Sequence, residues 1–272
     1  MTDHASPFAL VAGVLAFVVL AFLGLPIVAL LTAVPPADLP ALLTSPAALN
    51  AMWVSLETNL IANLLILTLG TPAAYLLARC EFRGKSAVLT LIELPLVLPP
   101  AVAGVALLAA FGAGGLLGST LAAWGIVIPF TTAAVVLAVA FVAAPFYLRA
   151  AISAFAAIDR SALDAARDLG ASEGLVFRRI ALPMAADGLR TGWALAFARG
   201  AGEFGATLLF AGSVARVTET LPLAVYAELG VSLDAAIAIG ILLLALSGAV
   251  LVVAKLPTSW SPATPGGEGG RW

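Results

Sequence analysis

Long runs of apolar residues alternate with short polar segments along most of the chain. A helix that crosses a hydrocarbon core of about 30 Å needs about 20 apolar residues. Backbone groups in lipid must be satisfied within their own segment, so we expect helices for runs of this length. Six windows qualify as transmembrane helices: Phe8–Leu31, Leu56–Ala78, Val88–Phe111, Ile126–Leu148, Leu189–Phe210 and Ala235–Ala254. The pattern therefore predicts an all-α, polytopic membrane protein with about six spans.

The chain divides into three parts on this pattern. Residues 1–34 form an N-terminal transmembrane span, because their apolar run exceeds the roughly 7–15 residues of a signal-peptide core. Residues 45–256 form the main transmembrane domain. Residues 257–272 are rich in Gly, Pro, Ser and Thr, which predicts a flexible C-terminal tail.

The composition supports a membrane protein and excludes several other classes. Of the 272 residues, 62% are hydrophobic and 10% charged, whereas soluble domains have about 45–50% apolar and about 25% charged residues. A net charge of -2 does not favour nucleic-acid binding. With one Cys and one His, the chain has no intrachain disulfide and no usual zinc constellation. We therefore expect no catalytic residue, no metal site and no cofactor bound by this chain.

The distribution of basic residues predicts the orientation in the membrane. The loops 35–55 and 112–125 contain no Lys or Arg, Arg199 falls inside the fifth window, and Arg216 lies beyond it. The other 11 of the 13 basic residues fall on the opposite side: Arg79, Arg83, Lys85, Arg149, Arg160, Arg167, Arg178, Arg179, Arg190, Lys255 and Arg271. The positive-inside rule places that side, with both termini, in the cytoplasm.

A charged island separates the fourth and fifth windows and begins at Asp159. Ser161 followed by Asp164 resembles a capping box and predicts the start of a short helix. Gly170 is placed to end that helix in the left-handed conformation. Three apolar residues at three-residue spacing predict a stripe along it: Leu163, Ala166 and Leu169.

A second helix is predicted to follow the first across a turn. Ser172 and Glu173 provide its start, and Pro183 is expected to interrupt it. The residues alone leave two interpretations open. The pair of helices is either a docking element for another protein or an ordinary linker at the membrane surface.

A family resemblance favours docking. The segments Asp164-Ala165-Ala166, Gly170 and Ile180-Ala181-Leu182-Pro183 resemble the EAA signature of permease subunits in bacterial ABC importers, with Asp164 in place of the usual Glu. The resemblance implies a type I ABC importer permease fold with a cytoplasmic coupling helix that sits in a groove of an ATPase subunit. It implies these residues as the coupling set: Asp164, Ala165, Ala166, Gly170, Ile180, Leu182 and Pro183.

Two further segments resemble the molybdate permease subunits of that family. Residues 94–104 open the third window, and residues 195–207 lie in the fifth. Sulfate permeases are similar in the second segment but typically have Tyr where this chain has Phe204, so a sulfate or thiosulfate permease remains the alternative.

The resemblance also implies partners and a location. The chain would pair with a second copy of itself and with two cytoplasmic ATPase subunits that use ATP and Mg. An external substrate-binding protein would deliver molybdate or tungstate and touch the short helix predicted over residues 218–229. The complex would lie in the bacterial inner membrane, in contact with lipid and not with nucleic acid.

Candidate residues for the translocation path come from charges and prolines inside the spans. Unpaired charge is costly there, and the spacing of Arg199 and Glu203 permits an ion pair. Arg199 either lends positive potential to an oxyanion path, or the pair only locks one helix against its neighbour. Prolines in the third window predict a bend that either lines the pore or is a static kink. The candidate set is Pro99, Pro100, Arg199, Glu203 and Thr207.

Other classes of protein are less well supported. A secondary transporter would need intramembrane carboxylates and often inverted repeats, and Glu203 is the one strongly placed candidate. The G-x-S-x-G match at residues 170–174 has no preceding strand, and the chain's one histidine is His4. A phosphate-binding loop at Lys85 lacks its first glycine, because Arg79 stands there.

Overall fold

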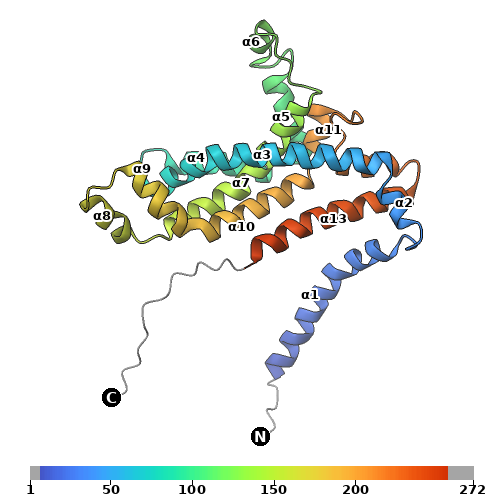
Figure 1. Cartoon of the computed structure of the whole chain (residues 1–272), viewed down its shortest axis with the longest axis horizontal. Coiled ribbons are helices and arrows are strands. Elements are labelled where there is room, and N and C mark those ends of the chain that lie inside the picture. The colour runs from blue at the N-terminus through green and yellow to red at the C-terminus, as the bar shows by residue number, and fades with distance from the viewer. Residues whose placement is uncertain (1–6, 257–272) are drawn as a thin grey trace.

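The computed structural model describes residues 7–256, and every regular element in that range is a helix (Figure 1). The elements are α1 (Pro7–Thr32), α2 (Leu39–Leu43), α3 (Pro46–Arg79), α4 (Lys85–Val97), α5 (Pro100–Phe111), α6 (Gly118–Ala123), α7 (Thr132–Ala156), α8 (Arg160–Asp168), α9 (Glu173–Val176), the π-helix η1 (Phe177–Ala181), α10 (Leu182–Ala201), α11 (Gly205–Ala211), α12 (Leu221–Glu228) and α13 (Leu233–Lys255). The predicted all-α class is confirmed.

The body is a bundle in which α7 packs on both α3 and α10, and α13 covers α10 and α12. Large buried side chains fill the space between the central helices, among them Tyr147, Phe155 and Phe197. The Tyr147 hydroxyl lies 2.5 Å from Oγ1 of Thr71 on α3. A buried hydroxyl without such a contact would be costly, so this bond helps to fix α7 against α3.

Four helices in the described range are long and apolar enough to cross a membrane: α1, α3, α7 and α13. A fifth span results if α4 and α5 are counted together, although they bend by 118° between them. That bend falls where the prolines predicted a departure from straight helix. The fifth predicted window, Leu189–Phe210, is not one helix, because the chain breaks between α10 and α11 at residues 202–204.

The ends of the helices differ from the ends of the predicted apolar windows, because capping residues and not hydropathy determine where a helix begins. Helix α3 begins at Pro46, well before Leu56, because the Ser45 hydroxyl accepts a hydrogen bond from the N–H of Ala48 at 3.3 Å. Helix α7 begins at Thr132, where Thr131 caps it. Apolar length alone carries no information about such side chains.

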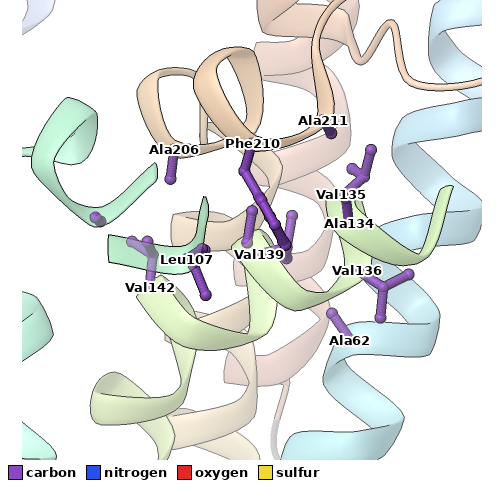
Figure 2. Close-up of a cluster of buried hydrophobic side chains, with 12 residues drawn as sticks. Ala62, Leu107, Ala134, Val135, Val136, Val139, Val142, Ala206, Phe210 and Ala211 are labelled. Carbon is purple, nitrogen blue, oxygen red and sulfur yellow. The ribbon is translucent and has the colours of Figure 1, made fainter. Parts of the chain in front are cut away.

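A compact apolar cluster joins four helices on one side of the body (Figure 2). Ala62 of α3 and Val139 of α7 meet Phe210 of α11 and Leu107 of α5 there, and all four are buried. Helices α5 and α11 project away from the main bundle in Figure 1. This cluster therefore holds both helices against α3 and α7.

Small residues on α10 bring it close to its neighbours. A methyl group at Gly192 would lie 2.8 Å from Cβ of Ala150 on α7, and one at Gly200 would lie 2.5 Å from Oδ1 of Asn59 on α3. Such small-residue ridges allow membrane helices to approach closely. Asn59 also donates to the carbonyl of Phe197 at 3.0 Å, which adds a buried polar contact at the same place.

Helix α1 lies mostly apart from the body (Figure 1). It carries the long apolar run predicted for the first span, and its side chains from Phe8 onward are almost all exposed. Near its end, Leu30 approaches Gly240 of α13. The predicted tail over residues 257–272 lies outside the described residues.

Candidate functional site

The charged island folds into a helical hairpin made of α8 and α9, with α8 starting earlier than predicted. Asp159 is the N-cap, and its Oδ1 accepts a hydrogen bond from the N–H of Ser161 at 3.0 Å. That bond holds the pKa of the Asp159 carboxyl below its usual value. The predicted capping box of Ser161 and Asp164 is therefore wrong: Asp159 is better placed, because its side chain precedes the first helical residue.

The end of α8 confirms the prediction for Gly170. This residue has φ +84°, in the left-handed region that glycine tolerates best. Its N–H donates to the carbonyl of Arg167 at 2.8 Å, and the N–H of Ala171 donates to the carbonyl of Ala166 at 3.0 Å. This pair of bonds is a Schellman motif, so the turn has a defined backbone geometry.

Arg167 joins the two helices of the hairpin. Its guanidinium donates to Oδ1 of Asp164 at 2.6 Å within α8, and to both carboxylate oxygens of Glu173 at 2.7 and 3.0 Å in α9. The bond from Arg167 holds the pKa of Glu173 below its usual value and raises the pKa of Arg167. The hairpin is therefore held by a polar clasp on its solvent side.

Apolar contacts hold the other side of the hairpin to the body. Leu163 and Val176 are buried in the cluster that also contains Phe155 and Ile158. The carbonyl of Ile158 accepts a hydrogen bond from Nη2 of Arg79, at the end of α3, at 3.0 Å. The hairpin is thus attached to the end of α3 as well as to α7.

The predicted apolar stripe on α8 is only partly formed. Leu163 is buried and Ala166 packs beside it, but Leu169 is 89% exposed. Leu169 is the C-cap residue, and on a helix of 3.6 residues per turn it lies about 120° round the axis from Leu163.

Pro183 does not interrupt the second helix as predicted. The chain continues from α9 through η1 into α10, with Pro183 near the start of α10. Proline lacks the N–H that an α-helix would use and its ring crowds the preceding turn. The π-helical turn over residues 177–181 accommodates both effects, so α9, η1 and α10 form one continuous rod.

The predicted coupling residues all lie in this hairpin and rod. Asp164, Ala165 and Gly170 are exposed on α8 and its turn, whereas Ile180, Leu182 and Pro183 are half-buried at the join with α10. Beside them is a polar hollow of about 410 Å³ lined by Ser172, Gly174, Leu175, Arg178 and Arg179. The two arginines flanking this hollow were not among the predicted site residues.

One face of α10 is open along its whole length. Exposed positions recur along it at Met184, Asp187, Thr191, Leu195 and Gly202, with Arg199 partly exposed on the same line. Charged side chains inside a membrane face water or protein rather than lipid. This face is thus a candidate for the translocation path or for a contact between subunits. Asp187 and Thr191 were not predicted from the sequence, because their place on an exposed face is known only from the structure.

Arg199 and Glu203 form the predicted ion pair, with Nη2 and Oε2 2.8 Å apart. Glu203 lies in the break after α10, and its Oε1 accepts a hydrogen bond from the N–H of Ala206 at 2.9 Å. From the residue before the N-cap Phe204, Glu203 therefore satisfies one of the N–H groups in the first turn of α11.

The two broken helices meet at their breaks. A methyl group at Gly205 would lie 2.8 Å from Cβ of Pro100, and one at Gly104 would lie 2.9 Å from the carbonyl oxygen of Ala206. Pro99 and Pro100 are exposed at the bend, whereas Thr207 is buried and its hydroxyl has no hydrogen-bond partner among the described residues. The structure thus brings the five path candidates to one region, where α5 contacts α11.

The apolar helices, the bent pair α4 and α5 and the polar hairpin define a helical membrane protein. The chain belongs to the family of binding-protein-dependent transport system inner membrane components, whose model matches residues 66–256. It is therefore a multi-pass inner-membrane protein, and the predicted resemblance to ABC importer permeases is confirmed.

Individual relatives narrow the family. The chain is 44% identical over 234 residues to the molybdenum transport system permease protein ModB of Mycobacterium tuberculosis, covering 85% of this chain and 88% of that one. It is 39% identical over 249 residues to a probable molybdenum ABC transporter permease of Haloferax volcanii, covering 90% and 89%. It is 41% identical over 178 residues to ModB of Escherichia coli, covering 65% and 78%.

Solved structures confirm the type I importer permease fold. A chain of a bacterial alginate ABC transporter, in complex with its alginate-bound periplasmic protein, superposes with a TM-score of 0.73 at 16% identity, covering 91% of this chain and 92% of that one. The MetNI methionine ABC transporter in an inward-facing conformation gives 0.59 at 18% identity, covering 76% and 92%.

Proposed function

We propose that this chain is the permease subunit of an ATP-driven importer of molybdate, with tungstate as a second substrate of the same size class. The assignment of molybdate as the substrate rests on the 44% identity to a molybdenum permease over most of both chains. The assignment to the ATP-driven importers rests on the exposed α8–α9 hairpin and its EAA-like residues. ATP is hydrolysed in the partner ATPase, and this chain has no catalytic role.

The hairpin transmits motion because it is stiff and because α9 continues through η1 into α10. Its clasp at Arg167 and its buried Leu163 resist bending between α8 and α9. The π-turn joins it to α10 without a loop. When the ATPase subunits close, a displacement of Gly170 and its neighbours passes along α10 to the break at Glu203, where α11 meets the bend at Pro100.

Two copies of the chain would enclose the path. The open face of α10, with Asp187, Thr191 and Arg199, is polar where lipid contact would be costly. A second copy related by two-fold symmetry would cover this face and leave a channel between the copies. At the opposite end from the hairpin, α12 and its C-cap residue present Tyr226 and Leu229 as contacts for the external binding protein.

Competition between anions for uptake tests which substrate the complex transports. Proteoliposomes containing the complete complex should take up radiolabelled molybdate in an ATP-dependent manner, and unlabelled tungstate should compete at similar concentrations. Stronger competition by sulfate than by tungstate would assign the chain to the sulfate or thiosulfate class. Uptake without an associated ATPase subunit would instead identify a secondary transporter.

The single cysteine tests the orientation. Cys80 is exposed at the end of α3, next to Arg79 and hence beside the hairpin. A membrane-impermeant maleimide should label Cys80 in inside-out vesicles and not in intact cells. A Cys80→Ser, Asp168→Cys variant should behave in the same way. Labelling of either cysteine from outside would contradict docking to a cytoplasmic ATPase.

A further inference from the structure

The two carboxylate oxygens of Glu203 contact two different groups, the guanidinium of Arg199 and a backbone N–H of α11. Oε2 lies 2.8 Å from Nη2 of Arg199, and Oε1 accepts the hydrogen bond from the N–H of Ala206 at 2.9 Å. The Glu203 side chain is 1% exposed, whereas that of Arg199 is 29% exposed. The carboxylate therefore compensates Arg199 from its buried side and leaves the other side of the guanidinium open toward the exposed face of α10.

The balance of charge at this point matters for transport of an anion. An uncompensated guanidinium inside a membrane protein attracts anions strongly, because the surrounding dielectric is low. A path that conducts must bind its ion weakly enough to release it. A carboxylate at 2.8 Å reduces the attraction of Arg199 without removing it.

We infer that Glu203 is a positioning residue that sets how strongly Arg199 holds a passing oxyanion. The inference rests on the proposed function, because it takes the open face of α10 as part of the path. It also links the anion to the moving parts, since the same carboxylate accepts a hydrogen bond from the first turn of α11. Helix α11 in turn contacts the start of α5, where Gly205 meets Pro100. A shift of α11 therefore changes the distance between the Glu203 carboxylate and the Arg199 guanidinium.

Substitution of Glu203 by Gln separates its two roles. The amide oxygen of Gln still accepts the hydrogen bond from Ala206, whereas the negative charge beside Arg199 is lost. Glu203→Gln should therefore bind molybdate about tenfold more tightly and turn over more slowly, because the anion is released late.

The experiment uses the purified complex of this chain with its ATPase subunits. Equilibrium dialysis with radiolabelled molybdate, in the absence of binding protein, measures the dissociation constant at the permease. Uptake into proteoliposomes with binding protein measures the maximal rate. The expected order of affinity is Glu203→Gln above wild type, and wild type above both Arg199→Met and the Arg199→Met, Glu203→Gln double variant.

A matched control removes a carboxylate from a different ion pair. Glu93 on α4 lies 3.4 Å from Arg149, and both are about half exposed. Glu93→Gln should leave molybdate affinity and uptake unchanged.

Three results would overturn the inference while leaving the proposed function intact. The first is wild-type affinity and rate in Glu203→Gln. The second is tight binding that persists in the double variant, because Arg199 would then not be the group responsible. The third is a Glu203→Gln complex that fails to assemble while the double variant assembles, since the carboxylate would then serve folding alone. Absence of molybdate uptake by the wild-type complex would instead refute the proposed function.

Discussion

The Glu173 carboxylate receives two hydrogen bonds from the guanidinium of Arg167, at 2.7 and 3.0 Å, across the turn at Gly170. Bidentate pairs of this kind restrict orientation as well as distance. The angle between α8 and α9 is therefore set by one side chain on the solvent side and by Leu163 and Val176 on the buried side. A docking element that transmits force needs this stiffness more than it needs stability.

Replacing Arg167 with Gln should loosen the hairpin without unfolding the protein. The pair is exposed to solvent, so its loss has little effect on global stability, and Leu163 still anchors α8. We expect weaker ATPase association and lower coupling between ATP hydrolysis and uptake. Copurification and the ratio of transport to hydrolysis measure both effects. An unchanged coupling ratio would show that the clasp is dispensable.

The same clasp predicts a dependence on pH. Arg167 holds the pKa of Glu173 below 4.5, and the bond from Ser161 holds that of Asp159 below 3.8. A carboxyl whose pKa is depressed by folding contributes stability above its unfolded pKa, and that contribution is lost as the pH falls through the folded pKa. Hairpin order should be constant from about pH 8 to about pH 5 and decline below about pH 4.

Spin-label mobility at position 168 measures this order, using Asp168→Cys in a Cys80→Ser background. Adding Arg167→Gln should remove the part of the transition that belongs to Glu173. A loss of order at pH values well above the ordinary carboxyl range would contradict the assignment to these two side chains.

Replacing Gly170 with Val should impair docking while leaving membrane insertion intact. A β-branched residue at φ +84° is strained by about 1–2 kcal/mol, and no neighbouring atom lies within 4 Å of a Cβ there, so the effect is conformational rather than steric. Gly114→Val is the matched control, because Gly114 also has open space, lacks the positive φ and lies outside the hairpin. Reduced ATPase association in the first variant alone is expected. Normal uptake by Gly170→Val would count against the docking hypothesis.

Features set by hydropathy and by local turn chemistry could be predicted from the sequence alone. The left-handed turn at Gly170 and the bend near Pro99 were both confirmed, because glycine and proline shape the backbone wherever they occur. Apolar length identified α1 and α13 with small errors at their ends. These features depend on few neighbours, so one chain is enough to see them.

Other features depended on contacts between distant segments. The break after α10 arises from the hydrogen bond between Glu203 and the first turn of α11 as well as from its glycines. The π-turn before Pro183 lets the chain continue where the sequence predicted an interruption. The open face of α10 is visible only once α3 and α7 cover its other faces. Hydropathy averages over such positions, because a single polar residue inside a span changes the mean very little.

Close packing along α10 predicts that Gly200 tolerates no larger residue. A methyl group there would lie 2.5 Å from Oδ1 of Asn59 and 2.8 Å from Cγ1 of Val139. Overpacking of this kind costs about 1–3 kcal/mol, so Gly200→Ala should lower the thermal unfolding temperature in detergent. Gly248→Ala on α13 is the control, since Gly248 has no atom within 4 Å of its added Cβ. Equal unfolding temperatures for the two variants would show that α10 can move away from α3.

The last prediction concerns the end of the bundle opposite the hairpin. The N–H of Leu221, at the start of α12, donates to the hydroxyl of Ser55 on α3 at 2.7 Å, and both residues are buried. Ser55→Ala leaves that N–H without an acceptor, at a cost of about 1–3 kcal/mol. Thr68→Ala is the control, because the Thr68 hydroxyl is exposed and bonds to carbonyls of its own helix. We expect Ser55→Ala to lower the unfolding temperature and to increase hydrogen exchange in residues 221–228, while Thr68→Ala changes neither. Unaltered exchange in Ser55→Ala would mean that Leu221 and its apolar neighbours suffice to hold α12, and that the surface offered to the binding protein does not depend on α3.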